Sequence, residues 1–277
     1  MMITEEPSAP AKDHPAMLVV RSIAFNLLFH LTLVLLMVLG LPALLGGRRA
    51  VFALANLWRA ASVWLLEAIC GLRVEYRGIE NIPAGAVLIA SKHQSFLETF
   101  ALLKYAPDFA IILKRQLTYI PLFGLYLIVS KQIAIDRAQG RQALQQIVEA
   151  ARPVFAAGRQ VFIYPEGTRR LPGAPPRYKT GVAGIYAGNA APCLPVALNT
   201  GLFWRRRGFL RRPGVAVIEY LPLIPPGLPR RAFADRLQET IETACDRLNA
   251  EAAAHDPSLM EVIRHGAASD RPDGALA

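Results

Sequence analysis

Two long apolar stretches lie near the start of the chain, and short strand-like runs alternate with amphipathic segments after them. The first stretch, Ile23–Leu45, is almost wholly apolar and, at ~1.5 Å per residue, is long enough to cross a ~30 Å hydrocarbon core. The second stretch, Val51–Cys70, is amphipathic and carries Trp58 and Trp64, which suit the headgroup level of a membrane. We therefore predict two membrane-associated helices in this part of the chain.

Two arrangements of these helices are compatible with the sequence. Either Ile23–Leu45 spans the bilayer fully, or both helices form a hairpin that dips into one leaflet, with the turn at Gly46–Arg49. Pro42 would bend or end the first helix, and both arrangements stay open. The apolar run is too long for a secretory signal peptide and lacks a small-residue cleavage site. For His30 we expect a polar contact between the two helices rather than a ligand role.

From Leu72 onward, strand-like runs alternate with helical patterns, which predicts an α/β domain with a mixed, largely parallel sheet of about seven strands flanked by helices. Several strand runs are apolar throughout, as is typical of strands covered on both faces. The expected strands are Arg73–Arg77, Ala86–Ala90, Phe109–Leu113, Gln132–Asp136, Gln160–Tyr164, Leu194–Leu198 and Val215–Tyr220. The expected helices are Phe96–Tyr105, Tyr119–Val129, Arg141–Ala157, Gly181–Gly188 and Arg230–Ala254.

Composition divides the chain into four parts. We expect a flexible leader over residues 1–16, membrane-anchoring helices over 17–71, the α/β domain over 72–255 and a fraying polar tail over 256–277. The chain has 277 residues, of which 53% are hydrophobic and 19% charged, so it is not a disordered protein. Its length suits one large domain with an appendage.

Charge and cysteine content restrict the classes of partner and site. Lys and Arg total 31 against 21 Asp and Glu, and the net charge of +10 favours a membrane surface, nucleic acid or a phosphorylated substrate. Cys70, Cys193 and Cys245 are far apart, so we expect neither a disulfide framework nor a CxxC site, and we infer a reducing compartment. No histidines form an HxxxH or HExxH pair, so no metal site is predicted.

The segment Trp204–Arg212 carries five arginines, half of the net charge. Aromatic residues among arginines also suit nucleic acid. Because two apolar segments are present in the same chain, we interpret this segment as a patch that meets anionic lipid, at ~1 kcal/mol per cation near the surface. Nucleic acid is therefore not an expected partner.

One histidine and one carboxylate follow the second strand run. His93 falls in the expected loop and Glu98 in the first turn of the next helix, at the strand end where open α/β sheets bind ligands. An imidazole can take a proton from an alcohol near neutral pH, and a carboxylate on its other ring nitrogen would fix its tautomer. Ser95 and Glu98 also match a capping box, in which Glu98 only satisfies a backbone donor. Their spacing alone does not decide between the two roles.

The segment Tyr164–Arg170 follows the fifth strand run and contains a second candidate site. Gly167 permits a tight turn after Pro165, and Arg169 can then hold a phosphate with two hydrogen bonds. The alternative is a solvated pair of arginines with Glu166 as its partner.

Three further cations are candidates for contact with an anionic substrate. Lys114 and Arg115 are adjacent at the end of the third strand run, where they face either solvent or substrate. Lys179 precedes the expected N-terminus of a helix, which is itself a favourable place for an anion.

Four segments, taken in order, resemble the successive motifs of the glycerolipid acyltransferases, most closely the bacterial lysophosphatidic acid acyltransferases. The segments are KHQSFLE, KRQLTYIPLFG, YPEGTRR and LPVALNTG, and the resemblance covers about Lys92 to Gly201. It implies that His93 is the general base that activates the hydroxyl of a lysophospholipid to attack an acyl thioester. The acidic partner five residues on is usually Asp in this family, whereas this chain has Glu98.

The resemblance also implies roles for the other motifs. Lys114 and Arg115 would add positive potential, and Leu194–Val196 would shape the acyl or acceptor pocket. The residues that would bind the phosphate-bearing acceptor are Glu166, Gly167, Thr168 and Arg169.

The activity implied is acyl transfer from acyl-CoA or acyl-carrier protein to 1-acylglycerol 3-phosphate, giving phosphatidic acid in phospholipid synthesis. Transfer from a thioester needs a base and a stabilising pocket, so no metal or other cofactor is expected. No GxSxG elbow supports a serine hydrolase. The alternatives are another acceptor, such as a lyso-ornithine lipid or lysophospholipid, or a non-catalytic lipid-binding membrane protein. Basic flanks place the domain on the cytoplasmic side of the cytoplasmic membrane.

Overall fold

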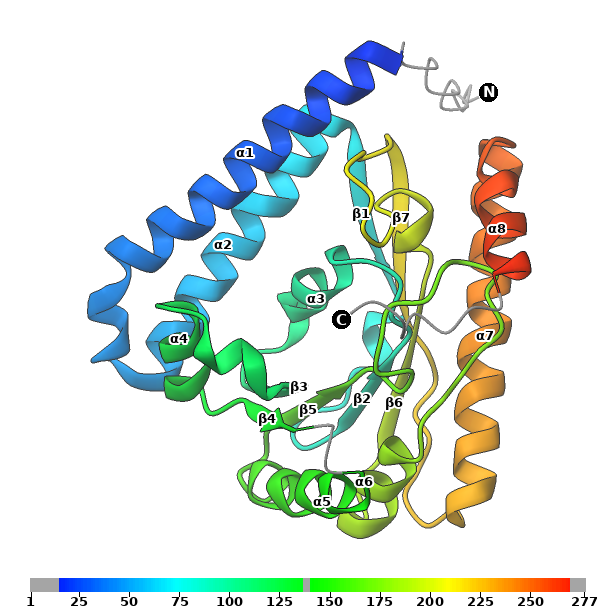
Figure 1. Cartoon of the computed structure of the whole chain (residues 1–277). Helices are drawn as coiled ribbons and strands as arrows, with labels where there is room; N and C mark the ends of the chain where they lie inside the picture. Colours follow the sequence, from blue (N-terminus) through cyan, green and yellow to red (C-terminus); the bar gives the residue numbers. More distant parts are fainter. Residues whose placement is uncertain (1–14, 137–139, 270–277) are drawn as a thin grey trace, which may run out of the picture.

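Seven strands form one sheet in the computed structural model, which describes residues 15–136 and 140–269 (Figure 1). Their order is β1-β7-β6-β2-β5-β3-β4, and β1 and β7 run opposite to the other five. This confirms the expected mixed, largely parallel sheet. The strands are β1 (Leu72–Arg77), β2 (Leu88–Ser91), β3 (Phe109–Lys114), β4 (Ile133–Ile135), β5 (Gln160–Ile163), β6 (Cys193–Leu198) and β7 (Gly214–Tyr220).

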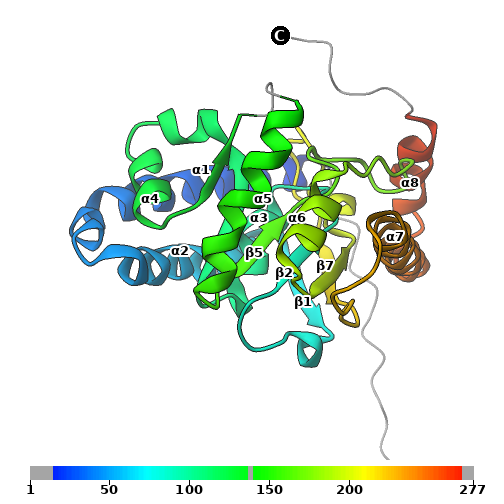
Figure 2. The ribbon, with the colours of Figure 1, turned by 90° about the horizontal axis from the view of Figure 1, so that it is seen from below.

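Helices cover both faces of this sheet (Figures 1 and 2). One face is covered by α1 (Pro15–Leu39), α2 (Gly47–Cys70) and α3 (Leu97–Ala101), and the other by α5 (Arg141–Ala156), α6 (Gly181–Asn189) and α7 (Arg230–His255). The remaining helices are α4 (Phe123–Val129), α8 (Leu259–Ala268) and the 3-10 turns η1 (Leu41–Leu44), η2 (Ile79–Asn81), η3 (Leu102–Tyr105), η4 (Arg115–Tyr119) and η6 (Thr200–Leu202).

Strand β2 illustrates why the central strands are apolar throughout. Ile89 packs into the hydrophobic cluster under α1 to α3, whereas Leu88 and Ala90 pack into the cluster under α5 to α7. Successive side chains of a strand point to opposite faces, so a strand covered on both faces has no polar side. The carboxyl ends of β2, β3, β5 and β6 meet at one edge of the sheet because these strands are parallel. The loops after β2 and β5 carry the candidate site.

The N-terminal helices differ in their bounds from the sequence expectation. Helix α1 begins at Pro15 and ends at Leu39, and η1 joins it to α2. The turn is therefore not at Gly46–Arg49, because Gly47 already begins α2. Pro42 helps to explain why the α-helix does not continue, since proline has no N–H to donate to the carbonyl oxygen four residues before it and its ring clashes with that carbonyl.

His30 and Trp58 also lie elsewhere than expected. The Nδ1 atom of His30 lies 2.7 Å from the carbonyl oxygen of Asn26 in the same helix, so this contact does not join the two helices. Trp58 packs against Phe29 and Phe100, with ring centroids 5.2 and 5.3 Å apart, instead of facing headgroups. Trp64, by contrast, is exposed.

Helix α1 has one face in the protein core and one face uncovered. Phe25 and Phe29 are buried in the cluster under the sheet. Leu27, Leu31 and Leu35 are exposed on the other side. Both α1 and α2 are long and apolar enough to cross a membrane by length and composition. The uncovered apolar surface of this pair is the feature that suggests membrane association.

The two ends of the chain require one correction and one restriction. The expected polar tail over 256–277 is wrong at its start, because α8 forms there and buries Leu259 and Val262 against the domain. Residues 270–277 lie outside the described part of the chain. The expected leader over 1–16 also lies outside it, except for the last two residues, which already belong to α1.

Candidate active site

His93 lies in the loop that follows β2, and its backbone is tied on both sides. The N–H of Lys92 donates to the carbonyl oxygen of Val196 in β6 at 3.0 Å. The carbonyl oxygen of His93 accepts from the N–H of Arg170, in the loop after β5, at 2.8 Å. The loop is therefore held between two neighbouring strand ends.

The structure brings His93 and Glu98 together. Nδ1 of His93 lies 2.8 Å from Oε1 of Glu98, whose side chain is fully buried. The same oxygen accepts hydrogen bonds from the N–H groups of Gln94 and Ser95 at 2.8 and 2.7 Å. Glu98 therefore makes the capping-box contact and the histidine contact at once, so the two interpretations of its spacing do not compete.

Thr200 holds the second oxygen of this carboxylate. Its hydroxyl donates to Oε2 of Glu98 at 2.7 Å, and the side chain of Gln94 accepts from the N–H of Gly201 at 3.1 Å. No local pattern marks Thr200 for this contact, although it lies in the LPVALNTG segment. Leu194–Val196, which the resemblance assigns to a substrate pocket, lie in β6, all of whose residues are buried.

The imidazole of His93 stacks on the ring of Tyr164, with centroids 4.1 Å apart and planes 22° apart. Burial and the nearby carboxylate of Glu98 raise the pKa of Tyr164, which keeps its phenol neutral. With Nδ1 bound to Glu98, the lone pair of the histidine is on Nε2. No residue in the described part of the chain forms a hydrogen bond to Nε2, so this nitrogen can accept a proton from a substrate.

The buried Lys92 holds the loop that carries His93 through two ion pairs. Nζ of Lys92 lies 3.1 Å from Oε1 of Glu166 and 2.8 Å from Oε1 of Glu242 in α7, and Tyr178 donates to Glu242 at 2.8 Å. Burial alone would lower the pKa of Lys92, but the two carboxylates outweigh it and raise this pKa. Burial raises the pKa of Glu166, against the lowering effect of its shared lysine. This cluster joins the two loops of the site to α7.

The position of Glu166 changes its expected role. Its side chain is 1% exposed and faces Lys92, so a direct contact with an acceptor phosphate is not supported. Glu166 instead stabilises the loop that carries Gly167, Thr168 and Arg169. The turn depends on Gly167, which has a φ of 66° and donates to the carbonyl oxygen of Tyr164 at 2.9 Å.

Arg169 and Arg170 do not form a solvated pair. Arg170 is buried and donates to the carbonyl oxygen of Pro175 at 2.9 Å. The guanidinium of Arg169 lies over the ring of Phe96, 5.4 Å from its centroid, and is partly exposed. Phe96 belongs to the loop between His93 and Glu98, so Arg169 presents a cation beside the histidine loop.

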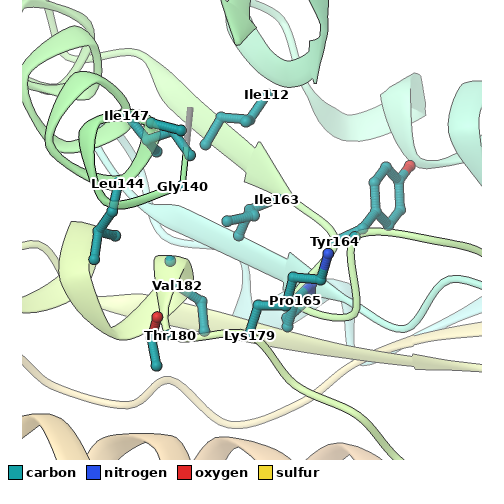
Figure 3. A pocket seen from close by; sticks show the side chains of 13 residues that line it. Ile112, Gly140, Leu144, Ile147, Ile163, Tyr164, Pro165, Lys179, Thr180 and Val182 are labelled. Atoms are coloured by element: carbon teal, nitrogen blue, oxygen red, sulfur yellow. The ribbon is translucent and has the colours of Figure 1, made fainter. Parts of the chain in front are cut away.

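The other predicted cations, Lys114, Arg115 and Lys179, are exposed on other segments of the chain than Arg169. Lys114 and Arg115 are exposed at the end of β3, and no side-chain hydrogen bond or ion pair joins them to another described residue. Lys179 is exposed just before α6 and lies at a cavity of about 270 Å³. Figure 3 shows the apolar wall of this cavity, with the ring of Tyr164 turned away from it. The wall is formed by Ile112, Leu144, Ile147, Ile163 and Val182.

The cationic segment after β6 is only partly a free surface. Arg211 is buried, donates to Oδ1 of Asn26 in α1 at 2.7 Å and lies 3.9 Å from the ring centroid of Trp204. Its expected place in a lipid-facing patch is therefore wrong, because it holds the segment to α1. Within residues 15–136 and 140–269, no group of three or more His, Cys, Asp or Glu could hold a metal ion.

Comparison with known proteins agrees with this geometry. The family model named Acyltransferase matches residues 73–199. A 1-acyl-sn-glycerol-3-phosphate acyltransferase of Pseudomonas aeruginosa is 36% identical over 208 residues, which cover 75% of this chain and 79% of that protein. The enzyme of the same name from Limnanthes alba is 30% identical over 173 residues, which cover 62% of this chain and 61% of the relative.

A solved structure shares the fold. The 1-acyl-sn-glycerophosphate (LPA) acyltransferase PlsC from Thermotoga maritima superposes with a TM-score of 0.70 at 20% sequence identity. The match covers 83% of this chain and 97% of that one. It therefore includes at least part of the N-terminal helix pair as well as the sheet.

Proposed function

The chain belongs to the acyltransferase family, and we propose that this O-acyltransferase moves an acyl group from a thioester to the free hydroxyl of 1-acylglycerol 3-phosphate, giving phosphatidic acid. The names of its relatives support this acceptor. The observation that carries the proposal is the 2.8 Å contact between Nδ1 of His93 and Oε1 of Glu98.

His93 would act as a general base through Nε2. The acceptor hydroxyl transfers its proton to Nε2 while its oxygen attacks the thioester carbonyl, and the carbon–sulfur bond then breaks. The leaving thiolate takes the proton back, so the free histidine is restored. Glu98 would fix the tautomer and stabilise the imidazolium that forms during attack. No protein nucleophile is needed, because the acceptor attacks directly.

Arg169 is the proposed contact for the acceptor phosphate. Its partly exposed guanidinium beside the histidine loop can form two charge-assisted hydrogen bonds with a phosphate. Thr168 and the backbone of Gly167 would complete this contact. Lys179, at the N-terminus of α6, would add positive potential at the neighbouring cavity. The donor would be acyl-CoA or acyl-carrier protein, and the proposed steps require no metal or other cofactor.

The site would work at the cytoplasmic face of the cytoplasmic membrane. The exposed apolar face of α1 and α2 is suited to lipid, where the acceptor resides. Because Phe25 and Phe29 fix α1 to the domain, we favour a hairpin in one leaflet over a full span of the bilayer. Lipid contact would then bring the acceptor to the edge of the sheet without withdrawing it fully from the membrane.

The test is a panel of lysolipids offered to the purified protein with acyl-CoA and with acyl-carrier protein, with products identified by mass. We expect phosphatidic acid from 1-acylglycerol 3-phosphate to be the main product. A main product from a lyso-ornithine lipid or another lysophospholipid would show a different acceptor. No product from any pairing would favour a non-catalytic lipid-binding protein.

A further inference from the structure

A second cavity, which is lined by cationic side chains, lies outside the His93 site, between the segment after η6 and helix α8. Its volume is about 280 Å³, close to that of the apolar cavity beside Lys179. Its lining combines four cationic or titratable side chains with an apolar floor. The lining residues are Leu171, Arg205, Arg206, Arg207, Val262 and His265, and we call this cavity the arginine cleft.

The walls of the arginine cleft are held in fixed positions by tight packing. Val262 is buried in the core, which fixes α8 against the domain. A Cβ atom at Gly266 would overlap the carbonyl oxygen of Pro172, and one at Gly173 would overlap that of Ile263. Only glycine allows so close an approach between α8 and the loop after Arg170. The cleft is therefore a feature of the packed fold.

Several arginine side chains lie close together at the cleft, and their charges repel one another. Burial, followed by the charge of Arg212, lowers the pKa of Arg205, and the exposed Glu261 only partly offsets this. Burial and the charges of neighbouring arginines, first Arg207, lower the pKa of Arg206. The Nε atom of Arg205 is buried and has no hydrogen-bond partner among the described residues. An anion in the cleft would relieve the repulsion and supply an acceptor for this nitrogen.

The cleft is linked by hydrogen bonds to the proposed catalytic loop. Nη1 of Arg206 donates to the carbonyl oxygen of Arg169 at 3.1 Å. The next residue, Arg170, donates its N–H to the carbonyl oxygen of His93 at 2.8 Å. A ligand in the cleft would thus lie next to the loop assigned to the acceptor phosphate, without using the side chain of Arg169.

We propose that the arginine cleft binds phosphate groups of the acyl donor, either those of a coenzyme A thioester or the phosphodiester of a phosphopantetheine arm. This inference rests on the proposed function, in which both substrates carry phosphate. Arg169 takes the phosphate of the acceptor, and the cleft takes that of the donor. Figures 1 and 2 place α8 on the opposite side of the domain from the tip of the α1–α2 hairpin, which favours a soluble donor over a lipid headgroup.

The experiment is calorimetric titration of the detergent-purified full chain with coenzyme A and with pantetheine, which lacks the phosphates. We expect the double variant Arg205→Gln with Arg207→Gln to bind coenzyme A about tenfold or more weakly, and pantetheine unchanged. The charge-matched control is Arg231→Gln, whose side chain is 96% exposed on α7. It should bind coenzyme A like the unaltered protein.

Two further measurements separate the possible outcomes. With acyl-CoA as donor, the double variant should raise the KM for the donor and leave the KM for 1-acylglycerol 3-phosphate unchanged. Equal coenzyme A affinity in the double variant and the unaltered protein would overturn the inference. Loss of binding to phosphatidylglycerol vesicles with unchanged coenzyme A affinity would overturn it in favour of a lipid headgroup site.

The single variant Arg207→Gln alters an exposed side chain and can replace the double variant in the coenzyme A titration if the double variant does not fold. It should weaken coenzyme A binding in the same direction, and an unchanged affinity would count against the cleft. Failure of the proposed function is distinct from these outcomes. In that case the unaltered protein forms no phosphatidic acid, while the calorimetric comparison of variants can still be read.

Discussion

Oε1 of Glu98 lies 2.8 Å from Nδ1 of His93 and belongs to a carboxylate that is fully buried. Because the same oxygen accepts two backbone N–H groups and Oε2 accepts from Thr200, three donors besides the histidine fix the carboxylate in place. Its position therefore does not depend on the histidine. Such a carboxylate can hold the imidazole in one orientation throughout a reaction.

Replacement of Glu98 by Gln separates charge from shape. The amide oxygen can replace Oε1, and Thr200 can turn its hydroxyl to accept from the amide nitrogen, so we expect a folded protein with a nearly unchanged melting temperature. Loss of the negative charge removes the stabilisation of the imidazolium, so kcat should fall strongly. Steady-state kinetics and thermal unfolding of the same preparation check both points. Full turnover by this variant would reduce Glu98 to a helix cap.

Lys92 is a buried charge near the site, and we expect its removal to lower the free energy of unfolding more than removal of an exposed charge would. Lys92→Met leaves Glu166 and Glu242 without their shared cation and should destabilise the protein by about 3–5 kcal/mol. Chemical denaturation in detergent measures this change. Adding Glu166→Gln and Glu242→Gln should recover much of the loss. The matched control is Lys104→Met, at an exposed lysine, where a change comparable to that of Lys92→Met would contradict the account.

Glu166 should make stability depend on pH. Its pKa is raised above the unfolded value of 4.5, so above pH 4.5 the native state holds a proton that the unfolded state has lost. The free energy of unfolding should therefore fall as pH rises from 4.5 through the raised pKa. Glu166→Gln should remove this part of the slope. If the free energy of unfolding depends on pH equally in the unaltered protein and in Glu166→Gln, the Glu166 carboxyl does not contribute to that dependence.

Much of the fold follows from local patterns in the sequence. All seven strands were expected, because each is a short apolar or alternating run bounded by turns or helical segments. Helix α8 was missed, since the tail is mostly polar and only a few residues such as Leu259 and Val262 face the domain. A short helix of this kind depends on tertiary packing more than on its own propensity.

In the candidate site, too, contacts between residues close in sequence could be expected, and contacts between distant residues could not. His93 and Glu98 are five residues apart, so their pairing can be expected from a loop followed by a helix turn. Thr200 lies 102 residues from Glu98, and Glu242 lies 150 residues from Lys92. Only the assembled sheet and α7 decide which distant side chains meet these groups, so neither partner could be expected from spacing.

The uncovered face of α1 can be tested by introducing charge. Leu31→Asp with Leu35→Asp places two carboxylates on exposed positions of the helix, at roughly 3 kcal/mol each at the centre of a bilayer. We expect the protein to leave sedimented membranes while keeping its melting temperature. Phe29→Ala should lower the melting temperature and leave the folded protein bound to membranes, because its side chain is in the core.

Deletion of residues 1–70 is a poorer test of membrane association. It would remove Phe25, Phe29 and Leu66 from the core as well as the apolar surface, so release from membranes could follow from unfolding. The point variants avoid this. If the doubly charged variant stays fully bound to membranes, another surface of the protein holds it there.

The turnover number of His93→Ala with 1-acylglycerol 3-phosphate and the better acyl donor tests the central claim most directly. The account predicts that the unaltered protein forms phosphatidic acid and that the variant, folded and membrane-bound, is slower by roughly 10²–10⁴-fold, the usual contribution of a positioned general base. Adding Glu98→Gln to this variant should cost little more, since there is no imidazole left to orient. Turnover by His93→Ala at the rate of the unaltered protein would contradict the assignment of His93 as the base.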